Sequence, residues 1–274
     1  MEFKSLEKIA AEIADTAGCL WEKGWAERNA GNISVNVTDL LSAEELSLFD
    51  TVSVEQLRGA RYTLGDQVIV VTAAGSRMRD IARDPRKYLC VLKITSEGTG
   101  YQILTAGGDK PTINSEKRKA KSENPTPTSE LPTHLAVHEM LVRTNSSSKA
   151  LVHTHCTELI ALTQISELCS TEKLNRLLWG MHPETILFVP KGVGFIPFEI
   201  PGTSGIAGTT VKTLETYPVA LWEKHGVLAT GSTAADAFDT IDLLAKSAKI
   251  YFLVKSAGYE PEGLTEEQLG KLMS

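Results

Sequence analysis

The sequence contains few cysteines, no long apolar run and no excess of positive charge. Only four of its 274 residues are cysteine, and their spacing forms neither a CxxC metal pair nor a dense disulfide framework: Cys19, Cys90, Cys156 and Cys169. Reduced thiols are therefore expected, as in a cytoplasmic protein. No stretch approaches the roughly 20 apolar residues that a membrane-spanning helix needs. Because Glu2 and Glu7 lie at the start and no apolar core follows them, we expect no targeting signal.

The charge balance argues against nucleic-acid partners. The 28 lysines and arginines are outnumbered by 34 aspartates and glutamates, which gives a net charge of −6. Proteins that bind DNA or RNA carry a basic surface, and none is indicated here. We therefore expect a small-molecule ligand, and an anionic one would be held by a few local groups. The length suits one large domain or two small ones.

Helical and strand patterns are mixed along the chain. Apolar residues recur at helical spacing from Phe3 to Trp21, which predicts an N-terminal helical segment over about residues 1–26. Further helices are predicted from near Pro132, over residues 159–165 and from near Thr233. Short apolar or alternating runs predict strands over residues 33–37, 68–71, 88–94, 100–104, 150–153, 185–190 and around 220–228. Residues 38–60 show no clear period.

These patterns favour a single α/β domain over residues 1–274. Because regular βαβ alternation is lacking, we expect a central, mostly antiparallel sheet covered by helices on both faces. Residues 105–127 form a polar segment with a basic cluster and several prolines. A mobile, solvated loop is the favoured interpretation of this segment, and a lid that closes over a substrate is the alternative.

A histidine pair marks the end of a predicted strand. In the segment VHTH (residues 152–155), alternate side chains point to the same side, so His153 and His155 can bind one cation together. Such a pair is incidental about as often as it binds a metal ion. His225 strengthens the metal hypothesis, because it lies between two apolar segments and is followed by Gly226, which allows a close turn.

Three imidazoles with an open fourth position are typical of catalytic rather than structural zinc sites. Zinc suits these ligands, although Co²⁺, Mn²⁺ and Fe²⁺ accept them as well. The alternative is that His225 is only a turn residue, since sequence distance alone does not bring it to the pair.

Polar residues precede the helix expected near Pro132. Thr128 and Ser129 offer hydroxyl and backbone N–H donors at a helix start, which is a natural anion site. Capping the helix is the commoner role of such residues. Glu130 follows them, placed either to act beside an anion site or to stabilise the positive end of the helix dipole.

Longer stretches of sequence identify a family. They run from about residue 24 to about residue 251 and include GWAERNAGNISV, VVTAAGSRMR, PTSELPTHLAVHE, VHTHCTELIALT, LLWGMHPETILFVPKGVGFIP and LWEKHGVLATG. These stretches resemble the class II sugar-phosphate aldolases, which share their fold with the adducin head domain. The resemblance implies their three-layer α/β fold and a lyase that breaks a sugar phosphate by a zinc-dependent aldol reaction.

The family's functional residues fall on matching positions of this chain. His153, His155 and His225 match its zinc ligands, with one Zn²⁺ per subunit, and Glu130 matches the carboxylate that works on the substrate. The resemblance also implies a cyclic homotetramer, in which Glu184 reaches the active site of a neighbouring subunit. The phosphate pocket that it implies comprises Asn29, Asn32, Gly75, Thr128 and Ser129.

Some positions depart from the family pattern. Ala74 stands where the phosphate pocket usually has a serine, which leaves the backbone N–H of Ala74 or the hydroxyl of Ser76 as substitutes. Thr154 replaces a cysteine between the first two ligands, and we expect little consequence because it faces away from the metal. Lys224 is adjacent to His225, but neighbouring strand residues face opposite ways, so we interpret it as structural rather than as a Schiff-base lysine.

The reaction that the resemblance implies is reversible cleavage of L-rhamnulose 1-phosphate, in L-rhamnose catabolism. Its products are dihydroxyacetone phosphate and L-lactaldehyde, and Glu130 is the expected base. Related activities on the same fold remain as alternatives, namely cleavage of L-fuculose 1-phosphate, 4-epimerisation of a pentulose 5-phosphate and dehydration of a thioribulose phosphate. A non-catalytic module like the adducin head is disfavoured, because it has no need for three zinc ligands together with Glu130.

Overall fold

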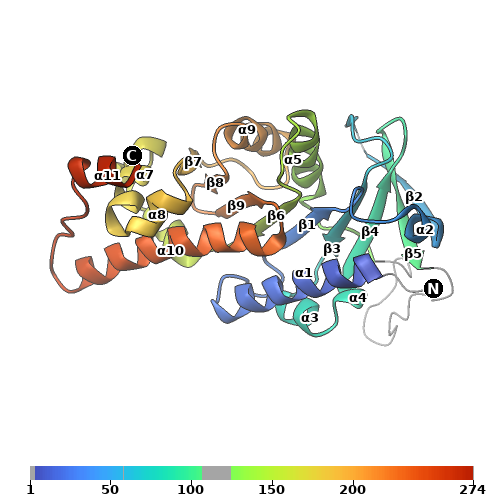
Figure 1. The fold of residues 1–274 in the computed structure, drawn as a ribbon, viewed down its shortest axis with the longest axis horizontal. Coiled ribbons are helices and arrows are strands. Elements are labelled where there is room, and N and C mark those ends of the chain that lie inside the picture. The colour runs from blue at the N-terminus through green and yellow to red at the C-terminus, as the bar shows by residue number, and fades with distance from the viewer. Residues whose placement is uncertain (1–3, 58, 107–124, 274) are drawn as a thin grey trace.

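Nine strands of the described residues form one sheet (Figure 1). The computed structural model describes residues 4–57, 59–106 and 125–273. The strands are β1 (Asn32–Asn36), β2 (Phe49–Gln56), β3 (Val68–Thr72), β4 (Leu89–Ile94), β5 (Gly100–Ala106), β6 (Ala150–Thr154), β7 (Val193–Ile196), β8 (Val219–Trp222) and β9 (Gly226–Gly231). Their order across the sheet is β2-β5-β4-β3-β1-β6-β9-β8-β7, and every neighbouring pair is antiparallel except β7 with β8.

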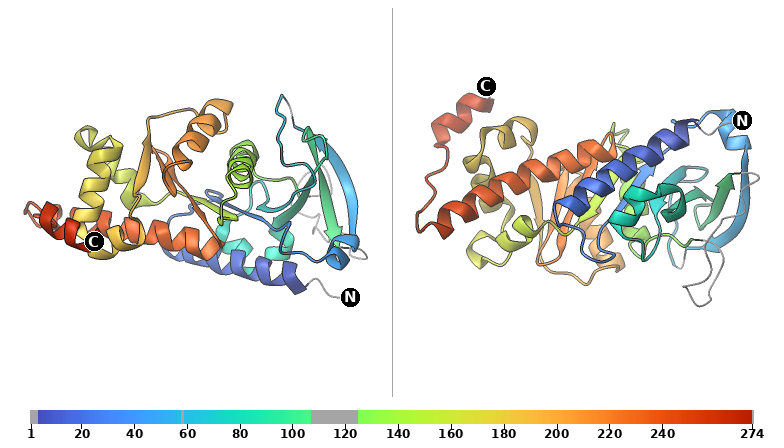
Figure 2. Two further views of the ribbon diagram at one scale, coloured as in Figure 1. Left: turned by 45° about the horizontal axis from the view of Figure 1, so that its top comes forward. Right: turned by 90° about the horizontal axis from the view of Figure 1, so that it is seen from below.

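Helices cover both faces of this sheet, as Figures 1 and 2 show. They are α1 (Lys4–Glu22), α2 (Ala43–Ser47), α3 (Met78–Arg83), α4 (Pro85–Tyr88), α5 (Leu131–Arg143), α6 (Thr157–Leu162), α7 (Thr171–Met181), α8 (Pro183–Phe188), α9 (Ser204–Leu214), α10 (Ala234–Ser256) and α11 (Glu266–Met273). Helices α1 and α10 pack on one face, and α5 and α9 pack on the other. The predicted architecture, a mostly antiparallel sheet between helical layers, is confirmed.

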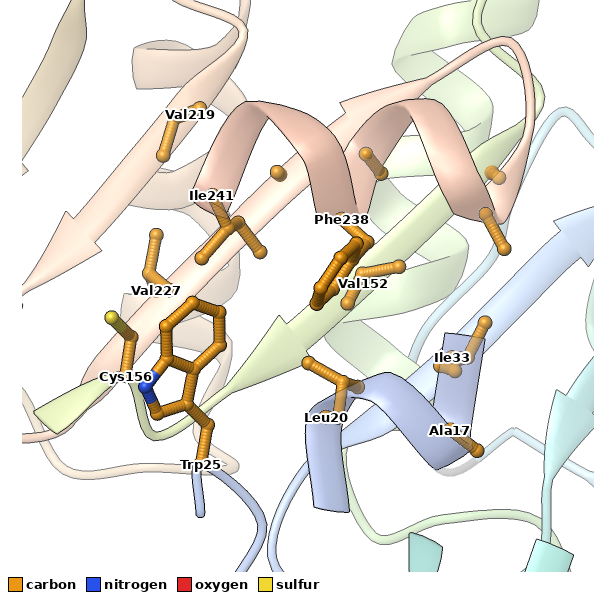
Figure 3. Close-up of a cluster of buried hydrophobic side chains, with 14 of the residues drawn as sticks. Ala17, Leu20, Trp25, Ile33, Val152, Cys156, Val219, Val227, Phe238 and Ile241 are labelled. Carbon is orange, nitrogen blue, oxygen red and sulfur yellow. The ribbon is translucent and has the colours of Figure 1, made fainter. Parts of the chain in front are cut away.

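Strand β6 lies in the middle of the sheet and carries the first histidine of the pair. All five of its residues are buried, because alternate side chains pack into opposite helical layers. Val152 packs in the cluster that contains Phe238 of α10 (Figure 3), whereas Leu151 packs in the cluster that contains Val137 of α5. Burial on both faces accounts for the unbroken apolar run that leads to His153.

The packing of α10 holds the end of β6 and the loop after α1 together. The Thr233 hydroxyl caps α10 by accepting a hydrogen bond of 3.0 Å from the backbone N–H of Asp236. Figure 3 shows Leu20 of α1 and Trp25 of the following loop beside Phe238, on the same side as the end of β6. This packing places the backbone carbonyl of Trp25 where it accepts a hydrogen bond from the backbone N–H of His155, the residue that follows β6.

Residues 185–190 are largely helical, so the strand predicted there is wrong. Helix α8 begins with Pro183 in its first turn, where the missing N–H of proline costs nothing. Its buried Thr185 and Ile186 are β-branched, and a short apolar run of this kind suits a strand or a buried helix equally well. The strand of this region is instead β7, which follows a turn at Gly192.

Residues 38–60, which show no sequence period, contain α2 and β2. Helix α2 has a capping box formed by Ser42 and Glu45. Strand β2 lies at the edge of the sheet with most of its side chains exposed, so no apolar alternation marks it. Helix α6 covers residues 157–162 rather than the predicted 159–165.

Most of the segment predicted as a polar loop or lid, residues 107–124 of 105–127, lies outside the described residues. All four cysteines lie within the described part of the chain, and their thiols are free. None of the helices that the structure describes is long and apolar enough to cross a membrane.

Candidate metal centre and active site

Three histidines converge at the end of strand β6. His153 is in β6, His155 is just beyond it, and His225 is in the turn between β8 and β9. Strand β6 pairs with β9 so that His153 lies opposite Leu228 and Thr154 opposite Val227. This register brings the turn before β9 beside the histidine pair. One potential ligand atom from each imidazole lies within 4.8 Å of the others, so the structure brings together the three predicted metal ligands.

Hydrogen bonds at the Nδ1 atoms orient two of the rings. His153 Nδ1 donates to the Val227 carbonyl at 3.0 Å, and His155 Nδ1 donates to the Glu27 carboxylate at 2.7 Å. Because both partners only accept, the protons lie on Nδ1 and the Nε2 lone pairs are available to a cation. The His155 backbone N–H also donates to Trp25 O at 3.0 Å, which anchors the residue beyond the strand.

The third ring has an unmet bonding capacity. His225 Nδ1 is buried and lacks a hydrogen-bond partner among the described residues. Burial, with the neighbouring His153, lowers the pKa of His225 to about 4, and burial likewise lowers the pKa of His153. Both rings are therefore neutral near pH 7, which is the state that binds a cation. Three imidazoles that offer ligand atoms within 4.8 Å of one another fit a metal centre.

The glycine after His225 is required by close packing around the histidines. A Cβ atom at Gly226 would lie 2.6 Å from the Thr154 carbonyl oxygen, 3.0 Å from His153 Cε1 and 3.1 Å from His155 Cδ2. The backbone can approach the pair this closely only because the side chain is a hydrogen atom.

Replacing Gly226 with alanine should weaken metal binding about 10- to 100-fold, since the added methyl group displaces the two imidazoles. The melting temperature should fall as well, and both quantities can be measured by metal titration and thermal unfolding. Gly208→Ala in α9 is the matched control, because nothing lies within 4 Å of its Cβ position. Equal metal affinity in Gly226→Ala and the unsubstituted protein would show that this contact does not shape the site.

Glu130 faces the histidines from the segment before α5. Its Oε2 atom lies 3.6 Å from His153 Nε2, and its Oε1 atom lies 3.9 Å from His225 Nε2. Burial raises the pKa of the Glu130 carboxyl, but attraction to His153 and a hydrogen bond from Asn32 outweigh burial, and the net shift is downward. The group is therefore a carboxylate that can accept a proton beside the candidate metal centre.

Backbone hydrogen bonds place Glu130 and the turn after β3 side by side. Thr128 N–H donates to the Thr72 carbonyl at 3.1 Å, and Ala74 N–H donates to the Thr126 carbonyl at 2.8 Å. Residues far apart in the sequence thus form one wall of the site. This pairing also bears on the two substitutes for the missing serine, Ala74 and Ser76.

Both of these substitutes are already used as donors. The Ala74 N–H is taken by Thr126, and the buried Ser76 hydroxyl donates to the Ala73 carbonyl at 2.6 Å. Since phosphate needs donors, neither group serves it in this conformation.

The five residues predicted to hold phosphate divide into buried and exposed ones. Asn32 and Thr128 are buried and contact Glu130, through a hydrogen bond from Asn32 Nδ2 to Glu130 Oε2 (3.0 Å) and another from Glu130 N to Thr128 Oγ1 (3.3 Å). The exposed residues are Asn29, Gly75 and Ser129. Their role in phosphate binding stays a prediction.

Glu184 lies apart from this group on α8. Its carboxylate contacts His182 Nε2 at 3.1 Å, and among the described residues no hydrogen bond or ion pair joins it to the three histidines or to Glu130. Its expected action in a neighbouring subunit stays a prediction.

Sequence reasoning missed two residues that support the histidines. Glu27 holds His155, and the Trp222 ring stacks on His225 with centroids 4.9 Å apart and an interplanar angle of 25°. Both belong to the stretches that identify the family, GWAERNAGNISV and LWEKHGVLATG. Their position in these stretches was the only sign in the sequence that the two residues matter. It did not indicate which histidine each of them contacts.

A cavity of about 480 Å³ adjoins the histidines and gives a small substrate access to them. Its lining includes Glu27, His155, Thr157, Ile160, Ala161, Lys224 and His225. Lys224 Nζ lies 2.9 Å from Glu223 Oε1, and this hydrogen bond raises the pKa of the exposed Lys224 ammonium. A protonated amine is not a nucleophile, so the site suits metal-assisted proton transfer by a carboxylate rather than Schiff-base chemistry.

The chain is similar to known proteins along nearly its whole length. The model of the Class II Aldolase and Adducin N-terminal domain matches residues 11–252. A rhamnulose-1-phosphate aldolase of Bacteroides thetaiotaomicron is 39% identical over 268 residues, which cover 98% of this chain and 94% of the relative. Another, of Pectobacterium carotovorum, is 35% identical over 91% of this chain and 86% of the relative. The solved structure of a sugar-phosphate aldolase from Thermotoga maritima has a TM-score of 0.77 at 34% identity, and the match covers 94% of this chain and 99% of that one.

Proposed function

This chain belongs to the class II aldolase and adducin family as an aldolase-type lyase, and we propose that it cleaves L-rhamnulose 1-phosphate at a zinc ion held by His153, His155 and His225. The products are dihydroxyacetone phosphate and L-lactaldehyde. One observation carries this proposal: three imidazoles offer ligand atoms within 4.8 Å of one another, and the Glu130 carboxylate lies beside them, 3.6 Å from His153. A binding module without catalysis has no use for that carboxylate.

The donor set suits zinc. Three neutral imidazoles leave one coordination position for a substrate, which is the composition of catalytic zinc sites. When bound there, the cation acts as a Lewis acid that polarises the carbonyl of the substrate. The hydrogen bonds from His153 to Val227 O and from His155 to Glu27 keep the rings in place whether or not the cation is present.

Glu130 moves the proton at carbon. In the cleavage direction, the Glu130 carboxylate takes the proton of the C4 hydroxyl, the bond between C3 and C4 of the ketose breaks, and C4 becomes the aldehyde carbon. The electron pair left at C3 then takes that proton back from Glu130, which returns to the carboxylate. In the synthetic direction the carboxylate of Glu130 removes that same proton from dihydroxyacetone phosphate, which is ordinary general base catalysis.

The phosphate binds between the segment before α5 and the turn after β3. The Thr128 hydroxyl oxygen accepts a hydrogen bond from Glu130 N, which leaves the hydroxyl proton for a phosphate oxygen. The exposed Ser129, Asn29 and Gly75 complete this pocket, with Asn32 at its buried side. These neutral groups suit a chain whose net charge is −6, and helix α5 directs its positive end at them.

The active enzyme is a homotetramer in which Glu184 of one subunit reaches the site of the next. Glu184 lies on α8 beside Leu187 and Phe188, which are 50% and 71% exposed. Exposed apolar side chains of this size are typical of surfaces that a partner covers. A carboxylate at such a surface is available to a neighbouring active site.

The deciding assay measures release of dihydroxyacetone phosphate from L-rhamnulose 1-phosphate with a coupled reductase, before chelation, after chelation and after zinc is added back. Cleavage should disappear with the chelator and return with zinc. Cleavage of L-fuculose 1-phosphate instead would keep the mechanism and change the substrate. If the zinc-loaded protein cleaves no ketose phosphate, epimerisation of a pentulose 5-phosphate becomes the better assignment.

A further inference from the structure

A buried chain of polar side chains leads from Glu130 into the interior between β1 and α5. The Asn32 amide lies between Glu130 and His134: its Nδ2 atom is 3.0 Å from Glu130 Oε2, and its Oδ1 atom contacts His134 Nε2. The Ser34 hydroxyl oxygen lies 2.6 Å from His134 Nδ1 and 2.8 Å from His138 Nε2. Both histidines and Ser34 are no more than 1% exposed, so no solvent replaces these contacts.

The chemistry of the partners gives every hydrogen bond in the chain a direction. Burial lowers the pKa of His134 to about 4 and that of His138 to about 3, so each ring is neutral and carries one N–H. The Glu130 carboxylate only accepts, so Asn32 donates to it and turns its carbonyl oxygen to His134.

His134 must then donate from Nε2, which leaves its Nδ1 atom as an acceptor. Ser34 therefore donates its only proton to His134 Nδ1, and the Ser34 oxygen accepts from His138 Nε2. No member of the chain can reverse without leaving a buried donor or acceptor unpaired, which is costly.

We infer that His134 and Ser34 are positioning residues that act through Asn32 to hold Glu130 Oε2 as an acceptor and to leave Oε1 as the oxygen that exchanges the proton with the substrate. The inference rests on the proposed function of Glu130 as the base. It gives Asn32 a role in addition to phosphate binding, because the carbonyl end and one N–H of its amide are committed to the chain, whereas its second N–H is not used by these contacts.

The geometry around Glu130 agrees with this division of its two oxygens. Oε2 is tied to Asn32 and lies against His153, whereas Oε1 lies 3.9 Å from His225 Nε2, beyond hydrogen-bond distance. A base must present one oxygen at hydrogen-bond distance from the reacting carbon's proton. Rotation of the carboxylate would misplace that oxygen, and small misplacements of catalytic groups cost rate.

The first test is Asn32→Ala in the full-length, zinc-loaded protein. We expect kcat to fall about 10- to 100-fold, because Asn32 orients the base. Loss of a phosphate contact made by the second N–H of Asn32 would raise KM in addition. Asn36→Ala is the matched control: Asn36 is a buried asparagine of the same strand that bonds Gln67 and Thr38 instead. Its kcat should be unchanged even if its stability falls. A raised KM with unchanged kcat in Asn32→Ala would overturn the inference in favour of phosphate binding.

A second pair of variants separates positioning from packing. His134→Gln keeps an N–H for Asn32 and an acceptor for Ser34, so it should retain most of kcat, whereas His134→Leu should lose as much as Asn32→Ala. Equal losses in the two His134 variants, or losses that track only the bound zinc, would show that His134 matters only for folding. If His134→Leu does not fold, His134→Gln and Asn32→Ala still test the inference: the first should retain most of kcat, and the second should lose it.

Nitrogen NMR of the histidine rings distinguishes failure of this inference from failure of the proposed function, since it needs no substrate. Both His134 and His138 should carry their proton on Nε2 in the unsubstituted protein. That tautomer in a protein that cleaves no ketose phosphate would support the chain and reject the function. A proton on Nδ1 of His134 would overturn the chain whatever the activity.

Discussion

Replacing Glu130 with glutamine should lower kcat about 10²- to 10⁴-fold and leave the zinc content unchanged. The amide has the shape of the carboxylate and still offers an oxygen to Asn32, but it cannot take a proton from carbon. His153 and His155 are oriented by their own hydrogen bonds to Val227 O and Glu27, and the amide replaces the carboxylate without a change of shape, so the ligands should keep their positions.

The measurement pairs steady-state cleavage with exchange of the carbon-bound proton of dihydroxyacetone phosphate in heavy water. Exchange needs no aldehyde and reports removal of the proton from carbon, so it should fall along with kcat. Glu139→Gln is the matched control, because Glu139 lies on α5, the helix that follows Glu130, but bonds Thr63 instead. Full activity in Glu130→Gln, or exchange at the original rate, would remove Glu130 from the role of base.

The sequence predicted those features of the site that depend on neighbours along the chain. His153 and His155 share a side because strand residues alternate, and β6 has the expected position. Whether His225 joins them depends on the pairing of β6 with β9, and only the structure shows that register. The resemblance to a family carried this step in the sequence analysis, and the geometry now gives its physical reason.

Other features needed the structure because their local patterns are ambiguous. His138 fits the apolar stripe of α5, and its burial agrees with that pattern, but nothing in the spacing indicates that Ser34 of another strand would bond it. The helix α8 has a composition that also suits a strand. Polar contacts between distant residues and the structure of short apolar segments could therefore not be predicted from this sequence.

Replacing His155 with alanine should remove both the bound metal and the cleavage activity. Of the ligands, His155 is the best to test, since its side chain is 24% exposed, compared with 1% for His153. Truncating His153 would also open a cavity in the core and leave the Val227 carbonyl without its donor, so lost folding would obscure lost binding. Removal of His155 leaves two imidazoles, which hold zinc far more weakly than three.

Zinc content and thermal unfolding together give this prediction a sharp readout. A ligand that binds only the folded state stabilises it by about 2.7 kcal/mol when its concentration is 100 times Kd. Added zinc should therefore raise the melting temperature of the unsubstituted protein and of Glu130→Gln, but not that of His155→Ala.

Thr154→Ser is the matched control for His155→Ala, because Thr154 lies between the two histidines yet directs its hydroxyl to the Trp25 carbonyl, a bond that serine retains. Its zinc response should match that of the unsubstituted protein. If His155→Ala kept a full equivalent of zinc, His155 would not be a ligand. The exposed imidazole would then be a wall of the substrate cavity, and the third protein ligand would have to be sought at Glu130 itself.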